Sequence, residues 1–107
     1  MNAEIMKALE QVQRMQEEVD NAEKSLGSLT ASAESGGGMV KVVANGFGDL
    51  VSIKLEKEVV DPADPEMLED LIIAATNSAI GKARSQAEQK MNSVRDKYMP
   101  DLPGLTS

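Results

Sequence analysis

The 107-residue sequence contains neither cysteine nor histidine. Without these residues the protein has no thiol or imidazole nucleophile, no disulfide and no zinc site of the usual Cys/His kind. Its carboxylates also form no pair that suggests general acid–base catalysis in a plausible pocket. We therefore expect a protein that is not an enzyme and that needs no cofactor and no small-molecule substrate.

Aromatic residues are almost absent as well, with one Phe, one Tyr and no Trp. The interior must consist of Val, Ile, Leu, Met and Ala, which bury less area per residue than aromatic side chains do. Length and hydrophobic content are ordinary for one folded domain, so we interpret residues 1–107 as a single domain. A core of this composition is thin in a monomer, which favours dimerisation.

Long hydrophobic runs are also missing. Glu4, Lys7 and Glu10 interrupt the N-terminal segment where a signal peptide needs a continuous apolar stretch, and no other run reaches the length of a membrane span. These features predict a cytoplasmic protein that does not associate with membranes.

The formal net charge is −7, which argues against nucleic-acid binding through an overall positive field. The basic groups are unevenly placed, however. Residues 82–97 contain five of them, opposed only by Glu88 and Asp96, so this segment carries a local charge of +3.

Residues 36–55, GGGMVKVVANGFGDLVSIKL, have the pattern of a β-hairpin. Polar and apolar residues alternate on both sides of an Asn-Gly-Phe-Gly turn, and a glycine triplet precedes them. With an even-length connection, one face of the hairpin is predicted to form the core. That face comprises Val40, Val42, Ala44, Val51, Ile53 and Leu55. Residues 29–35 are predicted to add an edge strand, which gives a three-stranded antiparallel meander over residues 29–55.

Helical periodicity flanks this meander on both sides. Residues 1–27 are predicted as an amphipathic helix with a heptad seam and with Gly27 as its C-cap. Residues 65–98 are predicted as a second helix. Its alanines at spacing four would let another helix approach closely, but plain packing is the favoured interpretation of these residues. Its end should project from the domain unless Gly81 breaks it, because 34 residues span about 50 Å and a domain of this size has a radius of gyration of roughly 13 Å. We expect residues 99–107 to form a flexible tail.

The acidic link Asp61-Pro62-Ala63-Asp64-Pro65-Glu66 has two interpretations. A carboxylate cluster could hold a metal ion, but nothing here matches the ligand spacing of an EF-hand loop. Helix-start chemistry explains the same residues better, because Asp64 suits the N-cap and Pro65 the first helical position. We therefore predict no metal site.

The basic residues of both helices are candidates for phosphate contact. On the second helix, Lys82, Lys90 and Lys97 fall on one side of the apolar stripe, and Arg84 and Arg95 fall on the other. On the first helix, Lys7 and Arg14 share a face. The alternative is that these side chains only border an apolar seam or form an ordinary solvated face.

Several of these stretches together resemble the YbaB/EbfC family of nucleoid-associated proteins. They are GGGMVKVVANGFGDLVSIKL, MLEDLIIAATNSAIGKA and the terminal LPGL. The resemblance implies an α+β fold with an N-terminal helix, a three-stranded meander and a long C-terminal helix, assembled as a tweezer-like cytoplasmic homodimer that binds DNA. It also implies that the helices make the DNA contacts, which points to Lys7, Arg14, Lys82, Arg84, Lys90, Arg95 and Lys97.

We thus predict a non-enzymatic homodimer that binds duplex DNA mainly through phosphates and takes part in nucleoid organisation and gene regulation. Base readout should be slight, since no recognition element of known type is present. The alternative is a protein-interaction module that uses its Ala-rich helices and Met-containing stripes, with incidental DNA affinity.

Overall fold

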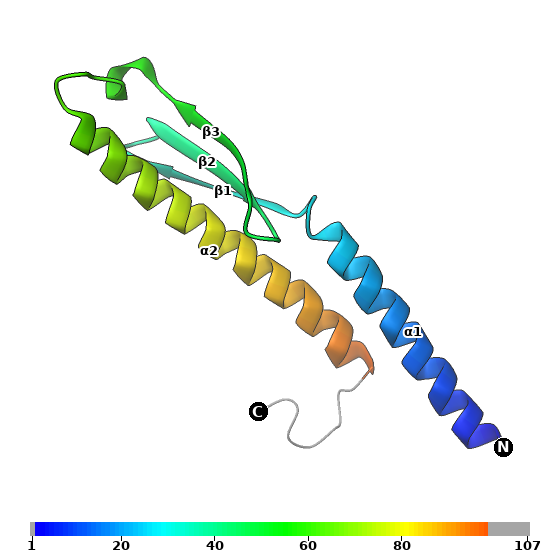
Figure 1. Ribbon diagram of the computed structural model, residues 1–107. Coiled ribbons are helices and arrows are strands. Elements are labelled where there is room, and N and C mark those ends of the chain that lie inside the picture. Colours follow the sequence, from blue (N-terminus) through cyan, green and yellow to red (C-terminus); the bar gives the residue numbers. More distant parts are fainter. Residues whose placement is uncertain (1, 99–107) are drawn as a thin grey trace. The chain divides into compact units, whose positions relative to one another are not determined.

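The computed structural model describes residues 2–98, which form an α+β fold (Figure 1). The elements in chain order are α1 (Ala3–Ser25), β1 (Thr30–Ser35), β2 (Val40–Asn45), β3 (Leu50–Leu55), the short 3-10 helix η1 (Lys57–Val59) and α2 (Pro65–Tyr98). Each predicted helix and strand is confirmed. The predicted tail at residues 99–107 lies outside the described residues.

The chain divides into two compact units. Residues 26–87 form the sheet unit, which contains the three strands, η1 and most of α2. Among the described residues, 2–25 and 88–98 form the helical unit, which consists of α1 and the end of α2.

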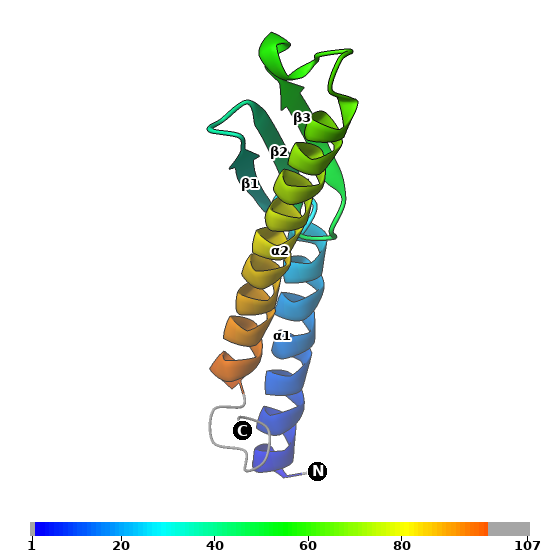
Figure 2. The same cartoon turned by 90° about the vertical axis from the view of Figure 1, so that its left-hand side faces the viewer.

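The sheet unit is an antiparallel meander of order β1-β2-β3 with α2 packed on one face (Figure 2). The turn from β1 to β2 is made by Gly36, Gly37 and Gly38, which have φ values of +62°, +67° and +93°. Only glycine adopts such angles readily, so the triplet is a turn, as predicted.

The core of this unit lies between α2 and the first two strands. Its buried members are Ala31, Ala33, Val40, Val42, Ala44, Val59, Ala75, Ala79 and Ala83. The alanine row of α2 is therefore a packing surface, which was the favoured interpretation of these residues. Small side chains at spacing four let the helix lie close to the sheet.

Strand β3 departs from the prediction in register and in burial. A register shift between Val43 and Ala44 pairs Ala44 with Leu50, so Val51 does not lie opposite Ala44 as an even-length connection requires. The predicted core pairs Val40 with Leu55 and Val42 with Ile53 do form. Every β3 residue is nevertheless exposed, because β1 and β2 are the only strands that contribute residues to the buried core.

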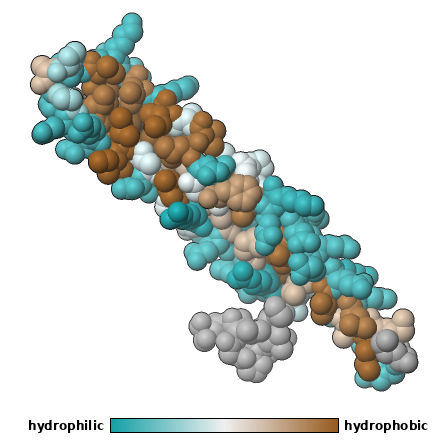
Figure 3. Space-filling view, in the orientation of Figure 1, coloured by the Kyte–Doolittle hydropathy of each residue, from teal (hydrophilic) through white to brown (hydrophobic). Residues whose placement is uncertain are grey.

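The surface at this end of the sheet unit is correspondingly apolar. Figure 3 shows hydrophobic residues gathered where β3 and the first turns of α2 lie. The large apolar side chains that these elements expose are Leu50, Val51, Ile53 and Leu55 of β3, Val60 of the link that follows, and Met67 and Ile73 of α2. Contiguous apolar surface of this kind usually marks an interaction site.

Gly27 is not the C-cap that was predicted for the first helix. Helix α1 ends at Ser25, whose hydroxyl donates to the Ala22 carbonyl at 2.7 Å, and Gly27 has no positive φ. A Cβ placed on Gly27 would lie 3.2 Å from the Phe47 ring, so this glycine allows a close approach of the β2–β3 turn.

The start of α2 confirms the helix-start interpretation of the acidic link. The Asp64 carboxylate accepts a hydrogen bond from the Met67 amide at 3.2 Å, and Pro65 is the first helical residue. The Asp61 carboxylate accepts from the Ala63 amide at 2.9 Å. Residues 2–98 contain no group of three acidic side chains placed to hold a metal ion.

Helix α2 continues without interruption through Gly81 to Tyr98, so this glycine does not break it. Within residues 2–98, no helix combines the length and the apolar character needed to cross a bilayer.

Candidate nucleic-acid interface

The helical unit contains an open hollow of about 490 Å³ between α1 and the last turn of α2. It is lined by Lys7, Glu10, Gln11, Arg14, Glu18, Lys97 and Tyr98. Three of these were predicted as DNA contacts, namely Lys7, Arg14 and Lys97. The spacing of seven between the first two puts them on one side of α1, and the fold adds the third from the far end of the chain.

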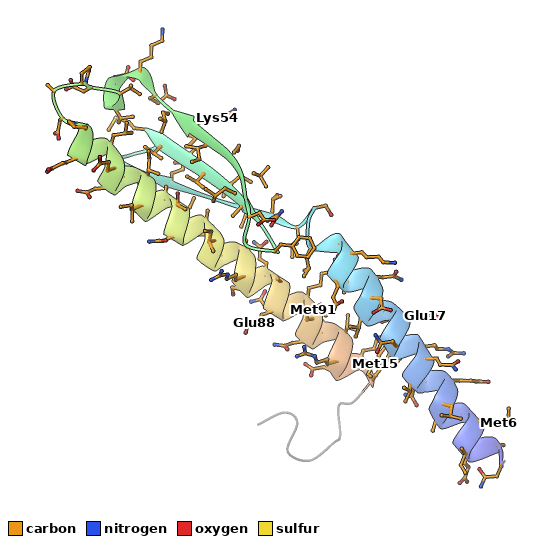
Figure 4. The ribbon with its side chains drawn as sticks, in the orientation of Figure 1. Met6, Met15, Glu17, Lys54, Glu88 and Met91 are labelled. Atoms are coloured by element: carbon orange, nitrogen blue, oxygen red, sulfur yellow. The ribbon has the colours of Figure 1, made fainter. Side chains whose placement is uncertain are left out.

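The two helices that form the hollow meet through modest apolar packing. Met15 of α1 and Met91 of α2, both half-buried, lie in the strip between the two segments (Figure 4). Val19 and Val94 are half-buried as well. This strip is the heptad seam of α1 meeting the apolar stripe of α2.

A cluster of three side chains closes one end of the hollow. The Glu18 carboxylate accepts a hydrogen bond from the Lys97 ammonium at 2.9 Å and another from the Tyr98 hydroxyl at 2.7 Å. Both bonds reach the same carboxylate oxygen, Oε1. The Lys97 Nζ also lies 5.4 Å from the centroid of the Tyr98 ring, within the range of a cation–π contact. We call Glu18, Lys97 and Tyr98 the clasp.

The clasp perturbs all three of its titratable groups. The hydrogen bond from Lys97, followed by that from Tyr98, lowers the pKa of Glu18. The same bond raises the pKa of Lys97, and the bond to Glu18 raises the pKa of Tyr98. At neutral pH the clasp therefore holds a carboxylate, an ammonium and a neutral phenol, with no net charge.

The remaining charges give the hollow a positive balance. Glu18 offsets Lys97, which leaves Lys7 and Arg14 against Glu10 alone. Among the described residues, neither Lys7 nor Arg14 belongs to an ion pair. Both side chains can thus turn toward an anion at little cost.

The other four predicted DNA contacts do not line this hollow. In the sheet unit, the Lys82 ammonium donates to the Ser32 carbonyl of β1 at 3.4 Å. The Arg84 guanidinium packs on Gly48, where an added Cβ would lie 3.4 Å from both Nε and Nη2. The sequence had placed these two residues on opposite sides of the stripe, and they do contact different parts of the sheet.

Lys90 and Arg95 belong to the helical unit but stand apart from the hollow. Lys90 is half-buried, whereas Arg95 is exposed and its Nη1 donates to the Asn92 side chain at 3.3 Å. The structure therefore unites three of the seven predicted residues and separates the others.

Sequence reasoning missed Glu18 and Tyr98 as members of the site. Glu18 is one of six acidic residues on α1, and Tyr98 is the last residue of α2. A signal for Glu18 does exist, since it directly precedes Val19 on the heptad seam and so borders the surface that α1 buries. Its partner could not be identified from that position alone.

Together the fold and the site define a small α+β protein that gathers cations on a helical surface, a class to which many DNA-binding proteins belong. The comparison with known sequences is more specific. The model of the YbaB/EbfC DNA-binding family matches residues 1–98, and the chain belongs to that family. The family is a DNA-binding one and not a class of enzymes.

Two similar proteins are named nucleoid-associated proteins. A nucleoid-associated protein of Thermodesulfovibrio yellowstonii is 46% identical, with 100% of this chain and 92% of the relative aligned. A nucleoid-associated protein of Pelotomaculum thermopropionicum is 41% identical over 98% of both chains. The crystal structure of an uncharacterized protein from Helicobacter pylori matches with a TM-score of 0.59 at 24% identity, covering 73% of this chain and 90% of that one, and supports the fold.

Proposed function

We propose that this protein associates with the nucleoid by binding duplex DNA through phosphate contacts from Lys7, Arg14 and Lys97. The observation that carries the proposal is the convergence of these three cations on one hollow, although they come from opposite ends of the chain. Contacts between cations and phosphates supply most of the affinity of sequence-tolerant DNA binding. They also position a protein on the duplex without reading its sequence.

The remaining predicted contacts have a lesser part in this proposal. Arg95 is exposed on the helical unit and can add a phosphate contact with little rearrangement. Lys82, Arg84 and Lys90 are each partly engaged by packing or by a hydrogen bond to the protein. Since no groove-reading element accompanies these cations among the described residues, we expect affinity to depend weakly on base sequence.

The test is a salt titration of DNA binding by fluorescence anisotropy on random and AT-rich duplexes. The affinity should fall with salt, and the log–log slope should decrease by about 0.9 for each phosphate contact removed. The variant Lys7→Ala/Arg14→Ala should therefore bind more weakly and show a slope flatter by about 2 per protomer.

A matched control is the variant Lys24→Ala/Lys57→Ala. Both lysines are exposed and lie outside the hollow, and the change in net charge is the same. The control should retain most of the affinity. Equal losses in the two variants would show that only overall charge matters, and a flat salt dependence of the unaltered protein would refute phosphate contact altogether.

We further propose that the protein is a homodimer in which a second copy covers β3. Leu50, Val51, Ile53 and Leu55 are between 40% and 56% exposed although they form one continuous strand. An apolar edge strand of this kind invites pairing with another strand. Two copies of β3 can pair their free backbone N–H and C=O groups with each other around a two-fold axis, because a two-fold interface uses the same surface of both subunits.

The oligomeric state tests this part of the proposal. Light scattering after gel filtration should give twice the 11.4 kDa of one chain for the unaltered protein. The variant Ile53→Lys should elute as a monomer. The control Ile5→Lys, at a more exposed isoleucine of α1 in the helical unit, should remain a dimer. A monomeric unaltered protein would instead favour a heterologous partner for this surface, as in the alternative of a protein-interaction module.

A further inference from the structure

The clasp commits two hydrogen-bond donors of the hollow to an anion that belongs to the protein itself. Glu18 Oε1 accepts from both Lys97 and Tyr98, at 2.9 and 2.7 Å. A phosphate oxygen can accept hydrogen bonds from the same two donors, since it is also an anionic acceptor. We propose that Glu18 is a built-in competitor of the DNA phosphate and that DNA binding at the hollow releases Lys97 and Tyr98 from it. The inference rests on the proposed phosphate contacts.

The number of hydrogen-bond donors on Tyr98 and Lys97 makes the carboxylate and the phosphate direct competitors. A phenol has a single O–H donor, so Tyr98 can donate either to Glu18 or to a phosphate, but not to both. An ammonium group has three donors, and Lys97 could in principle bridge the two anions. A phosphate brought that close would however face the Glu18 carboxylate, and like charges at hydrogen-bonding range repel strongly.

The clasp is accessible enough to exchange partners. The side chain of Lys97 is 62% exposed and that of Glu18 is 37% exposed. Exposed ion pairs hold together only weakly, so an incoming phosphate can displace the carboxylate. Glu18 thus lowers the affinity for DNA without blocking the site.

The variant Glu18→Gln tests this role because it removes the charge and keeps the shape. The uncharged amide oxygen has two lone pairs and can still accept hydrogen bonds from Lys97 and Tyr98, but more weakly than a carboxylate, so the helical unit should stay folded. DNA affinity should rise about two- to fivefold, the range expected from freeing an exposed ion pair. The log–log salt slope should steepen by about 0.9 per protomer, because Lys97 becomes available to one more phosphate.

The variant Glu17→Gln is the matched control. Glu17 is exposed on α1, next to Glu18 in sequence, and does not line the hollow (Figure 4). The Glu17→Gln variant also removes one negative charge, so it measures how much DNA affinity rises from the change in net charge alone. If Glu18→Gln and Glu17→Gln strengthen binding equally, the competition does not exist. In a Lys97→Gln/Tyr98→Phe background, which lacks both donors of the clasp, the two variants should become equivalent, and a persisting difference would also overturn the proposal.

Tyr98 supplies an independent readout, since it is the only tyrosine of the chain and tryptophan is absent. Ultraviolet titration of the phenol should show a raised pKa in the unaltered protein and a value closer to normal in Glu18→Gln. Tyrosine emission should change when DNA is added to the unaltered protein and much less when it is added to Glu18→Gln. Unchanged emission on DNA binding, or weaker binding by Glu18→Gln, would show that Glu18 only holds the helices in place.

These results remain distinguishable from failure of the proposed function. If DNA does not contact the hollow, the variant Lys7→Ala/Arg14→Ala binds as its control does. If DNA contacts the hollow but Glu18 does not compete, that variant loses affinity while Glu18→Gln and Glu17→Gln behave alike.

Discussion

Gly81 offers a substitution whose effect can be worked out from the structure. It lies inside α2, it has no positive φ, and a Cβ added to it would meet no heavy atom within 4 Å. Alanine is favoured over glycine in a helix interior by about 0.8–1 kcal/mol, chiefly because the glycine loses more backbone entropy on folding. With no clash to offset this gain, Gly81→Ala should stabilise the protein by about 0.5–1 kcal/mol.

A gain of this size should raise the melting temperature by about 2–8 °C. Circular dichroism at a fixed protein concentration measures it, and Ala79→Gly is the matched opposite change two residues away. Ala79 is fully buried against the sheet, so its replacement should destabilise by about 1 kcal/mol or more through lost propensity and lost packing. A lower melting temperature for Gly81→Ala would refute the reasoning and would indicate that a second chain packs closely on this glycine.

Two further predictions concern the β1–β2 turn and the clasp. Gly36→Ala should destabilise by about 1–2 kcal/mol because of its positive φ, and it should cost more than Gly37→Ala, since its new Cβ would lie 3.1 Å from the Leu71 side chain whereas that of Gly37 meets nothing within 4 Å. Urea denaturation compares the two, and equal costs would contradict the steric part of the argument. The hydrogen bond from Lys97 lowers the pKa of Glu18, so this contribution to stability is present at neutral pH and is lost as the pH falls through the lowered value. Melting curves below about pH 4 should therefore show a loss that is smaller in Glu18→Gln, and parallel losses in the two proteins would exclude a role of the clasp in acid stability.

The elements of this fold could be predicted because each has a local signal. Alternation defines the hairpin, the glycine triplet defines its first turn, and the helical period combined with Asp64 and Pro65 defines α2 from its first residue to Tyr98. These signals depend only on residues that are close in sequence, so the elements that they predict are found in the folded chain.

The register and exposure of β3 depend on information that the strand itself does not contain. The register shift lies between Val43 and Ala44, next to the turn in which the Asn45 side chain accepts hydrogen bonds from the amides of Phe47 and Asp49. Whether a strand is buried depends on which strands the helix covers, and here α2 covers β1 and β2. Alternation alone indicates two faces but not which part of a face is covered.

The clasp illustrates the same limit for the candidate site. Glu18 and Lys97 are 79 residues apart and meet only because the end of α2 packs beside α1. The sequence marked Lys97 as a cation on a helix, but its partner could be found only in three dimensions. In the sequence, Glu18 is only one of several acidic residues, and nothing there indicates that it accepts hydrogen bonds from Lys97 and Tyr98.

The placement of charge explains how so acidic a chain can bind DNA and why Glu18 matters more than its neighbours on α1. The described part of the helical unit holds eight acidic and six basic groups, a balance of −2, so long-range attraction does not bring it to DNA. Attraction must come from cations within a Debye length of the phosphates, about 10 Å at 0.1 M salt. An acidic group outside the hollow is largely screened there, whereas Glu18 contacts one of those cations directly. Removing one negative charge from α1 should therefore strengthen binding most at Glu18, less at Glu10 on the wall of the hollow, and least at Glu17, and that order separates local competition from overall charge.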